Sequence, residues 1–149
     1  MQTVVPSEML QLVTFKLAGQ RYAVDILKVQ EINNLREITA IPNASHYLVG
    51  AINLRGKVIS VISLHKKFNL KGEPSGEAAK IVIVDVRGVV MGLLVDAVSD
   101  VLRISKEIVE LPPCVSSNMS TEFIMGIAKL ADGLVILLDL NKLFGEDGH

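Results

Sequence analysis

The chain has 149 residues, half of them apolar, with a formal net charge of −1 at pH 7 and no tryptophan. This composition excludes a disordered chain, and it leaves no basic surface of the kind that binds nucleic acid. No apolar run reaches the roughly 18 residues of a membrane span, and the amino-terminal segment lacks the features of a secretory signal. We therefore expect a cytoplasmic protein without membrane insertion.

Short strands are predicted along the whole chain, because branched aliphatic residues alternate with polar ones between frequent turn residues. The dipeptides Arg55-Gly56 and Arg87-Gly88 predict two-residue hairpins, since glycine supplies the positive φ that such turns require. A short helix is expected at 140–144, and 111–121 is the longest irregular loop. The expected strands are 12–17, 22–26, 29–32, 38–41, 50–54, 58–64, 80–86, 89–95, 98–104, 123–130 and 134–138.

An internal repeat dominates the sequence, because residues 48–68 and 124–144 align without a gap. A weaker similarity upstream makes Asp25 and Asp96 equivalent. The copies then run from about 12 to 68 and from 80 to 144, with 69–79 as a Gly- and Pro-containing linker within one domain spanning 1–149. The identical pairs of the strong segment are Gly50/Gly126, Leu54/Leu130, Leu64/Leu140, Lys66/Lys142 and Phe68/Phe144.

The repeat predicts an all-β fold. Each copy supplies about five short strands, which can close into a small barrel and so remove exposed sheet edges. Two such barrels packed side by side bury apolar faces that one small barrel could not cover alone. We therefore expect two five-stranded barrels, one from 12–68 and one from 80–144, with a short C-terminal helix.

No catalytic or metal-binding motif is present. The histidines at 46, 65 and 149 lack metal-ligand spacing, and we expect His46 and His65 to be solvated turn residues. The only cysteine, Cys114, is interpreted as an incidental thiol. Asp25 and Asp96 could form an acid–base pair, but structural caps at equivalent positions explain them more simply. We expect no enzyme activity, no metal and no cofactor.

Arg55 is the most interesting charged residue, because its positive charge is absent from the second copy. Glu31 likewise occurs only in the first copy, where Asp100 is its shorter counterpart. One interpretation is an ordinary exposed turn arginine. The other is a Glu31–Arg55 pair that holds the hairpin against a neighbouring strand and orients a contact surface.

The motif Gly50-Ala-Ile-Asn-Leu-Arg-Gly56, with the apolar strand that follows, closely resembles the signature of the CheW family of chemotaxis coupling proteins. Residues 22–32, 92–102 and 126–130 support this resemblance in the same order. The chain has Ser60-Val-Ile-Ser63-Leu64 where the family usually has Pro-Val-hydrophobic-Asp-Leu. Both changes lie on a strand that its apolar positions already specify, so they affect local detail and not membership.

The resemblance implies a non-enzymatic adaptor of two five-stranded barrels, which bridges methyl-accepting chemoreceptors to the regulatory domain of the histidine kinase CheA. It implies that a receptor helical hairpin lies in a groove between the barrels, and that the kinase docks at barrel ends. A small double-barrel protein that binds a ligand or an oligonucleotide is the alternative. Carried over by motif, the receptor-binding residues are Val13, Ile26, Val29, Glu31, Arg55 and Val98, and the kinase-binding residues are Ile38, Thr39 and Ile41.

Overall fold

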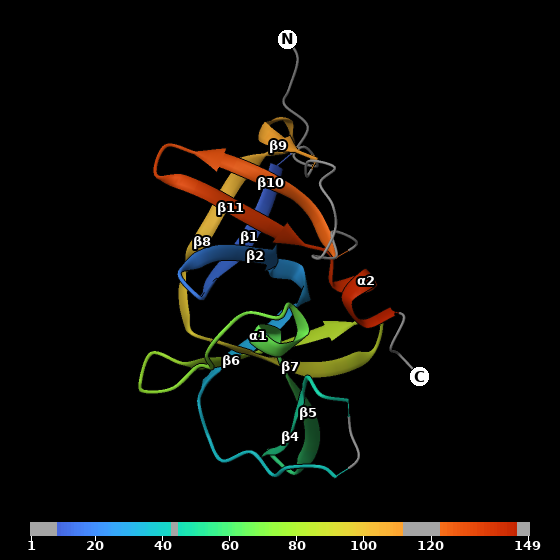
Figure 1. The fold of residues 1–149 in the computed structure, drawn as a ribbon. Helices are drawn as coiled ribbons and strands as arrows, with labels where there is room; N and C mark the ends of the chain where they lie inside the picture. Colours follow the sequence, from blue (N-terminus) through green and yellow to red (C-terminus); the bar gives the residue numbers. More distant parts are fainter. Residues whose placement is uncertain (1–8, 43–44, 112–122, 146–149) are drawn as a thin grey trace.

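The protein is almost entirely β-structure in the computed structural model, which describes residues 9–42, 45–111 and 123–145 (Figure 1). The only α-helices in these ranges are α1 (Leu64–Lys67) and α2 (Leu140–Gly145). The strands are β1 (Met9–Leu17), β2 (Gln20–Asp25), β3 (Val29–Asn34), β4 (Leu48–Leu54), β5 (Lys57–Ser63), β6 (Lys80–Val86), β7 (Val89–Val95), β8 (Ala97–Ser105), β9 (Val109–Glu110), β10 (Ile124–Leu130) and β11 (Gly133–Leu138). The all-β prediction and the short C-terminal helix are confirmed.

The strands form two sheets, one above the other in Figure 1. The six-stranded sheet has the order β8-β1-β2-β11-β10-β9, and the five-stranded sheet has the order β3-β6-β7-β5-β4. Neighbouring strands are antiparallel except at two places, where β11 runs parallel to β2 and β7 runs parallel to β5. No continuous ladder joins the two outer strands of either sheet, so each is a strongly curved sheet and not a fully closed barrel.

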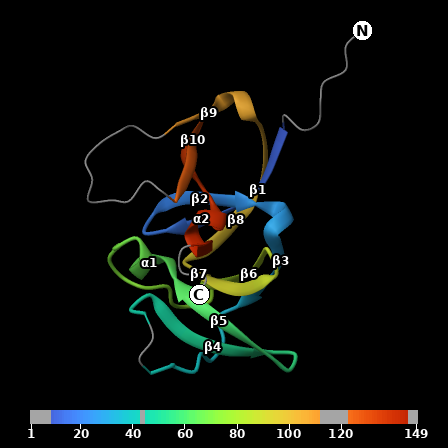
Figure 2. The same ribbon diagram turned by 90° about the vertical axis from the view of Figure 1, so that its right-hand side faces the viewer.

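The sheets do not follow the two sequence copies. Strands β1 and β2 belong to 12–68 but lie in the six-stranded sheet with β8 to β11, whereas β6 and β7 of the second copy complete the five-stranded sheet. The prediction that each copy forms its own barrel is therefore wrong, because the copies exchange their first hairpins. The crossover after β2 is the 3-10 helix η2 (Ile26–Lys28), which turns the chain out of one sheet and into the other (Figure 2).

Both faces of the central strands are buried. On β6, Ile81 and Ile83 point into a cluster inside the five-stranded sheet, while Val82 and Val84 point into the core between the two sheets. A third cluster fills the six-stranded sheet. Burying each such side chain contributes about 1.5–3 kcal/mol. The exchange of hairpins places these two-faced strands at the contact between the sheets, which we call the inter-sheet core.

The tight turns match their predicted chemistry. Arg55 and Gly56 have φ values of 51° and 88°, and Arg87 and Gly88 have values of 53° and 89°. Positive φ at both central residues is the mark of a type I′ turn, whose twist matches that of the flanking strands. The predicted hairpins β4–β5 and β6–β7 are confirmed.

The glycine that both copies share lies where a strand-like segment crosses the sheet edge. A Cβ on Gly50 would lie 2.1 Å from the carbonyl oxygen of Thr39. A Cβ on the equivalent Gly126 would lie 2.4 Å from Cγ1 of Val109 and 3.0 Å from the carbonyl oxygen of Glu110. Separations of 2.1 and 2.4 Å are ones that real Cβ atoms essentially never show. Gly50 is therefore needed for close backbone approach, whereas at Gly126 the Val109 side chain takes the space of a Cβ.

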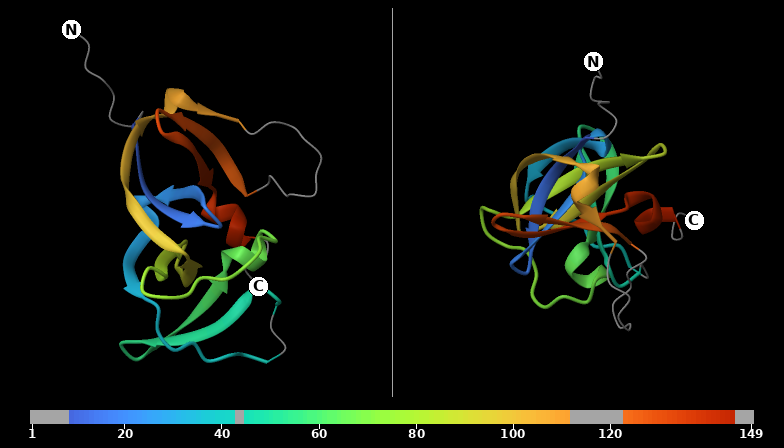
Figure 3. Two further views of the ribbon diagram at one scale, coloured as in Figure 1. Left: turned by 60° about the vertical axis from the view of Figure 1, so that its left-hand side comes forward. Right: turned by 90° about the horizontal axis from the view of Figure 1, so that it is seen from above.

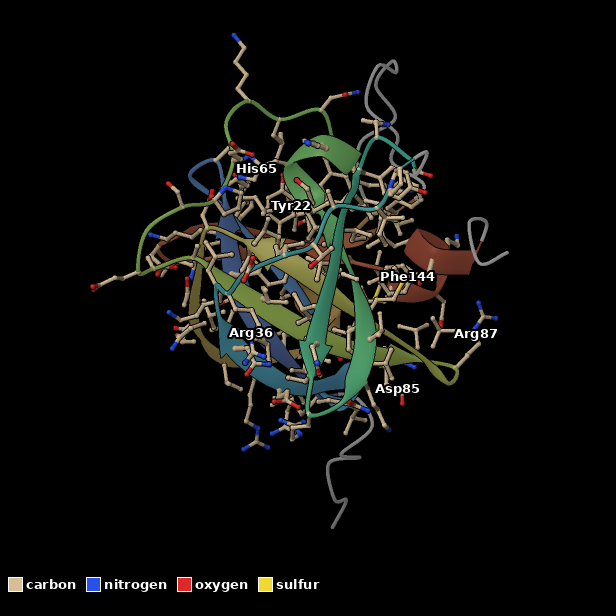
Figure 4. The ribbon with its side chains drawn as sticks, turned by 90° about the horizontal axis from the view of Figure 1, so that it is seen from below. Tyr22, Arg36, His65, Asp85, Arg87 and Phe144 are labelled. Carbon is tan, nitrogen blue, oxygen red and sulfur yellow. The ribbon has the colours of Figure 1, made fainter. Side chains whose placement is uncertain are left out.

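His65 is buried, and the prediction that it is a solvated turn residue is wrong. His65 is 2% exposed, because Leu64 and His65 both lie on the covered side of the single turn of α1. Its Nδ1 lies 3.0 Å from the carbonyl oxygen of Lys71, and its Nε2 lies 3.0 Å from Oδ2 of Asp96. The same carboxylate oxygen accepts the backbone N–H of Ala18 at 2.8 Å. Figure 4 shows His65 beside α1.

The two equivalent aspartates are both structural, but in different ways. Asp25 accepts the backbone N–H of Leu27 at 2.9 Å and so caps η2, as expected. Asp96 caps no helix among the described residues; it joins the β1–β2 turn to α1 through His65. The predicted cap is therefore confirmed at Asp25 and corrected at Asp96.

We expect Gly126→Ala to lower the free energy of unfolding by about 1–3 kcal/mol, the usual effect of overpacking. Adding Val109→Ala should restore part of this loss, since it removes the side-chain atom nearest the new Cβ. Gly50→Ala should be destabilising without any such rescue, because its nearest neighbour is backbone. Urea denaturation measures all three. Gly19→Ala is the control for backbone strain alone, since nothing lies within 4 Å of its Cβ position.

We expect His65→Ala to lower the free energy of unfolding by about 2–4 kcal/mol, because it opens a cavity, takes the His65 partner from the Lys71 carbonyl and removes one of the two hydrogen bonds of Asp96 Oδ2. His46→Ala, at an exposed histidine, is the matched control and should stay within about 0.5 kcal/mol of the parent. Thermal and urea unfolding measure both. Equal stability of the two variants would show that the buried network contributes nothing.

Candidate functional site

Three of the predicted receptor-binding residues lie together at the rim of the inter-sheet core. Val29 on β3 lies opposite Val84, and Val98 on β8 lies opposite Phe15, so each extends a row of core side chains to the outer strand of its sheet. Ile26 in η2 packs against the same core. All three are partly buried. We call Ile26, Val29 and Val98 the apolar rim; Figure 3 (left) shows η2, β3 and β8 along one side of the molecule.

Val13 does not belong to this rim. It is 3% exposed and lies within the inter-sheet core, opposite Val24 on β2 and Val101 on β8. Its covered position leaves no face for a partner, so its expected contact role lacks structural support. Leu27 and Val101, which sequence reasoning missed, are 86% and 54% exposed at η2 and β8. For Leu27, the signal in the sequence is Asp25, which caps a 3-10 turn. This turn directs Leu27 outward while Ile26 stays against the core.

Glu31 and Arg55 form the expected ion pair. Nη1 of Arg55 lies 3.3 Å from Oε1 of Glu31, and Nη2 contacts the second carboxylate oxygen. Asn33 also donates to Oε1 of Glu31 at 3.3 Å. Glu31 is on the outer strand β3, and Arg55 is in the turn that follows the opposite outer strand, β4, so the pair links the two edges of the five-stranded sheet and not neighbours within a ladder.

The pair shifts the pKa of both groups. The hydrogen bond and the charge of Arg55 hold the pKa of Glu31 below its ordinary value, against a smaller opposing effect of desolvation. Glu31 in turn raises the pKa of Arg55. A carboxylate with a lowered pKa stabilises the fold above its unfolded pKa, and this contribution is lost as the pH falls through the folded value. The Arg55 side chain is 70% exposed, so the pair mainly orients the two side chains.

The predicted kinase-binding residues lie on the segment that follows β3. Thr39 exchanges two backbone hydrogen bonds with Ala51 on β4, of 2.9 and 2.8 Å. Ile38 packs against the cluster inside the five-stranded sheet, while Thr39 is exposed and Ile41 is 40% exposed. The structure therefore places this segment along the free edge of β4.

The described residues contain no candidate metal site. No three His, Cys, Asp or Glu side chains gather there as a potential metal site. Every buried polar side-chain atom in the same ranges has a hydrogen-bond partner, including both nitrogens of His65. None of the described helices has the length and apolar character that crossing a bilayer requires. Cys114 lies outside the described residues.

Comparison with known proteins gives a consistent picture. Residues 11–148 match the family model of the CheW-like domain. The chain is 36% identical over 136 residues to a probable chemotaxis protein CheW of Rhizobium etli, covering 91% of this chain and 88% of that protein. It is also 36% identical over 146 residues to the chemotaxis protein CheW of Treponema pallidum, covering 95% and 86%.

The fold is matched as well. The crystal structure of the scaffolding protein TtCheW from Thermoanaerobacter tengcongensis superposes with a TM-score of 0.84 at 38% sequence identity, covering 94% of this chain and 95% of that one. A family match over nearly the whole chain, together with this structural likeness, shows that the chain belongs to the CheW family.

Proposed function

We propose that this protein couples the cytoplasmic tips of methyl-accepting chemoreceptors to the regulatory domain of the histidine kinase CheA. Membership of the CheW family makes the chain a non-enzymatic chemotaxis adaptor. What we propose in addition is the identity of its two partners. The observation that supports this step most directly is the apolar rim, where partly buried side chains from both sheets pack against the inter-sheet core.

The apolar rim suits the side of a receptor helix. An amphipathic helix binds by placing its apolar face against a hydrophobic surface, and Ile26, Val29 and Val98 offer such a surface at the meeting of two sheets. We assign Glu31, which follows Val29 on β3, and Arg55 to the polar margin of this surface, where they would set the register of the helix through charge complementarity. Val13 would support the rim from inside, through its contacts with β2 and β8.

The kinase contact is assigned to Ile38, Thr39 and Ile41. This segment combines exposed apolar surface at Ile41 with a single pair of backbone hydrogen bonds to β4. A regulatory domain with a similar barrel could pair with this end of the five-stranded sheet. Because both proposed partners act on the cytoplasmic side of the membrane, the proposal also places the protein in the cytoplasm.

The first test of this proposal is a pull-down with the tagged protein from a lysate of its own source. It should recover a kinase and chemoreceptors. A ligand- or oligonucleotide-binding protein of the same fold would recover neither. Titration against the purified kinase regulatory domain then measures the kinase contact by itself.

We expect Val98→Asp to weaken receptor binding by at least about tenfold, because it places an unpaired charge in an apolar contact. Kinase binding should remain. Leu134→Asp is the matched control, since it puts the same charge on a half-exposed residue of β11 outside the apolar rim. Loss of both activities together with a lower melting temperature would assign Val98 to the core and would contradict a docking role.

We expect Arg55→Glu to reduce receptor-controlled kinase activation strongly while leaving the melting temperature unchanged. Combining it with Glu31→Arg should restore part of the activation, because the swap rebuilds the attraction with reversed sign. Activation in a reconstituted receptor–kinase–adaptor mixture supplies the double-mutant cycle. Asp132→Lys, which breaks the separate Arg21–Asp132 pair at its 74% exposed member, is the control and should have no effect. Strictly additive effects at 31 and 55 would rule out the pair as a unit.

A further inference from the structure

Asp100, the second-copy counterpart of Glu31, is bonded to a buried threonine. The hydroxyl of Thr14 on β1 lies 2.6 Å from Oδ1 of Asp100, the length of a charge-assisted bond in which the hydroxyl donates. The same hydroxyl accepts the backbone N–H of Asp100 at 3.0 Å and lies 3.0 Å from its carbonyl oxygen. One side chain of β1 therefore holds both the backbone and the carboxylate of Asp100.

These bonds lie at an irregularity in the pairing of β1 with β8, two strands that run side by side in Figure 1. Val13 and Phe15 on β1 are separated by one residue, Thr14. Their partners on β8, Val101 and Val98, are separated by two residues. The extra residue makes this a β-bulge, which interrupts the regular ladder and bends the strand. The Thr14 hydroxyl thus binds β8 at the point where the ladder is irregular.

The bulge sets the direction of Val98. Side chains of a regular strand alternate between its two faces, so residues three apart point to opposite sides. Val98 and Val101 are three apart, yet their partners on β1 both belong to the inter-sheet core. Because paired residues share a face, the extra residue brings Val98 and Val101 onto the same side. Val98 reaches the apolar rim in this way.

The rim valine of the other sheet has a similar neighbourhood. The register of β3 also shifts directly after Val29, where Gln30 is the extra residue opposite β6. Both rim valines therefore precede a bulge, and each is followed two residues later by an acidic residue, Glu31 or Asp100. Bulges occur often beside functional sites, where they re-aim a side chain. In β8 the acidic residue is bonded to a hydroxyl that is itself covered.

We propose that Thr14 and Asp100 are positioning residues for receptor binding: their hydrogen bonds hold the bulge of β8 and with it the direction of Val98 at the apolar rim. This role rests on the proposed function, in which Val98 contacts a receptor helix. Thr14 is 0% exposed, so it cannot touch a partner and acts only through the strand that it holds. Asp100 is exposed on an outer strand, so changes there leave the packing of the core intact.

The direction of Val98 can be measured in the free protein by NMR. An NOE between the Val98 methyl groups and the Phe15 ring reports that the two residues lie opposite each other. We expect Thr14→Val, which keeps the shape but removes the hydroxyl, to weaken this NOE at least about twofold, because Val98 then leaves the directly opposite position for part of the time. Asp100→Ala should act in the same direction, and Thr14→Ser should keep the NOE.

Titration with a purified cytoplasmic-tip fragment of a chemoreceptor measures the consequence for binding. Thr14→Val and Asp100→Ala should each weaken binding at least about threefold, the factor that corresponds to losing one hydrogen bond of ordinary net strength. Affinity for the kinase regulatory domain should not change. Thr14→Ser and Asp100→Asn should bind the fragment as the parent does, since each keeps the bonding oxygen. Ser99→Ala, at the exposed neighbour in the same bulge, is the matched control and should also bind normally.

Val135→Ala controls for lost stability alone, because it truncates a fully buried residue of β11 whose partners exclude β8. It should leave receptor binding unchanged below its melting temperature. An unaltered NOE in both Thr14→Val and Asp100→Ala would overturn the positioning role, and so would a weakened NOE with unchanged receptor binding.

The charge of Asp100 provides a further distinction. Asp100→Asn binding as weakly as Asp100→Ala would make the carboxylate a direct receptor contact and would also overturn the positioning role. No binding of the fragment by the parent protein would overturn the proposed function, and the receptor part of this proposal with it. The NOE needs no partner, so it still decides whether Thr14 and Asp100 set the direction of Val98.

Discussion

The contact between the two sheets is the feature on which the rest of the structure depends. Strands such as β1, β6 and β7 are apolar on both faces, and neither sheet could bury both faces alone. Exchange of the first hairpins between the two sequence copies places these strands at the inter-sheet core. The apolar rim is the margin of that same core, so the surface proposed for the receptor exists because the sheets meet there.

Polar side chains divide into two groups with different roles. His65 is buried and Asp96 is partly buried, and three hydrogen bonds at these two residues join the β1–β2 turn to α1. In the second pair Arg55 is exposed and Glu31 is partly buried, and the pair joins β3 to the turn after β4. Removing a partner from a covered network leaves an unsatisfied group, whereas an exposed pair loses little stability. The first pair therefore maintains the fold, and the second is available to partners.

The shared glycine connects the repeat to the function. Gly50 and Gly126 are kept in both copies because the chain crosses over each at a separation that no Cβ allows. In the six-stranded sheet the crossing segment is the regular strand β9. In the five-stranded sheet it is the segment around Thr39, held by one bridge and by side chains. The same architectural step thus makes two strand pairs in one sheet and a single bridge, within the proposed kinase segment, in the other.

The sequence by itself determined most strand positions, the turns at Arg55 and Arg87 and the repeat, because alternation and glycine chemistry are local signals. The expected strand at 38–41 is instead a single bridge at Thr39, and only the folded chain decided between the two interpretations of Arg55 by bringing it to Glu31. Which sheet each strand joins was decided only in the tertiary structure. The parallel pairings β2–β11 and β5–β7 join segments from different copies, and a strand that is apolar on both faces fits either sheet. For the same reason Val13 and His65 were misplaced: their burial depends on strands and turns distant in the sequence, which no local pattern specifies.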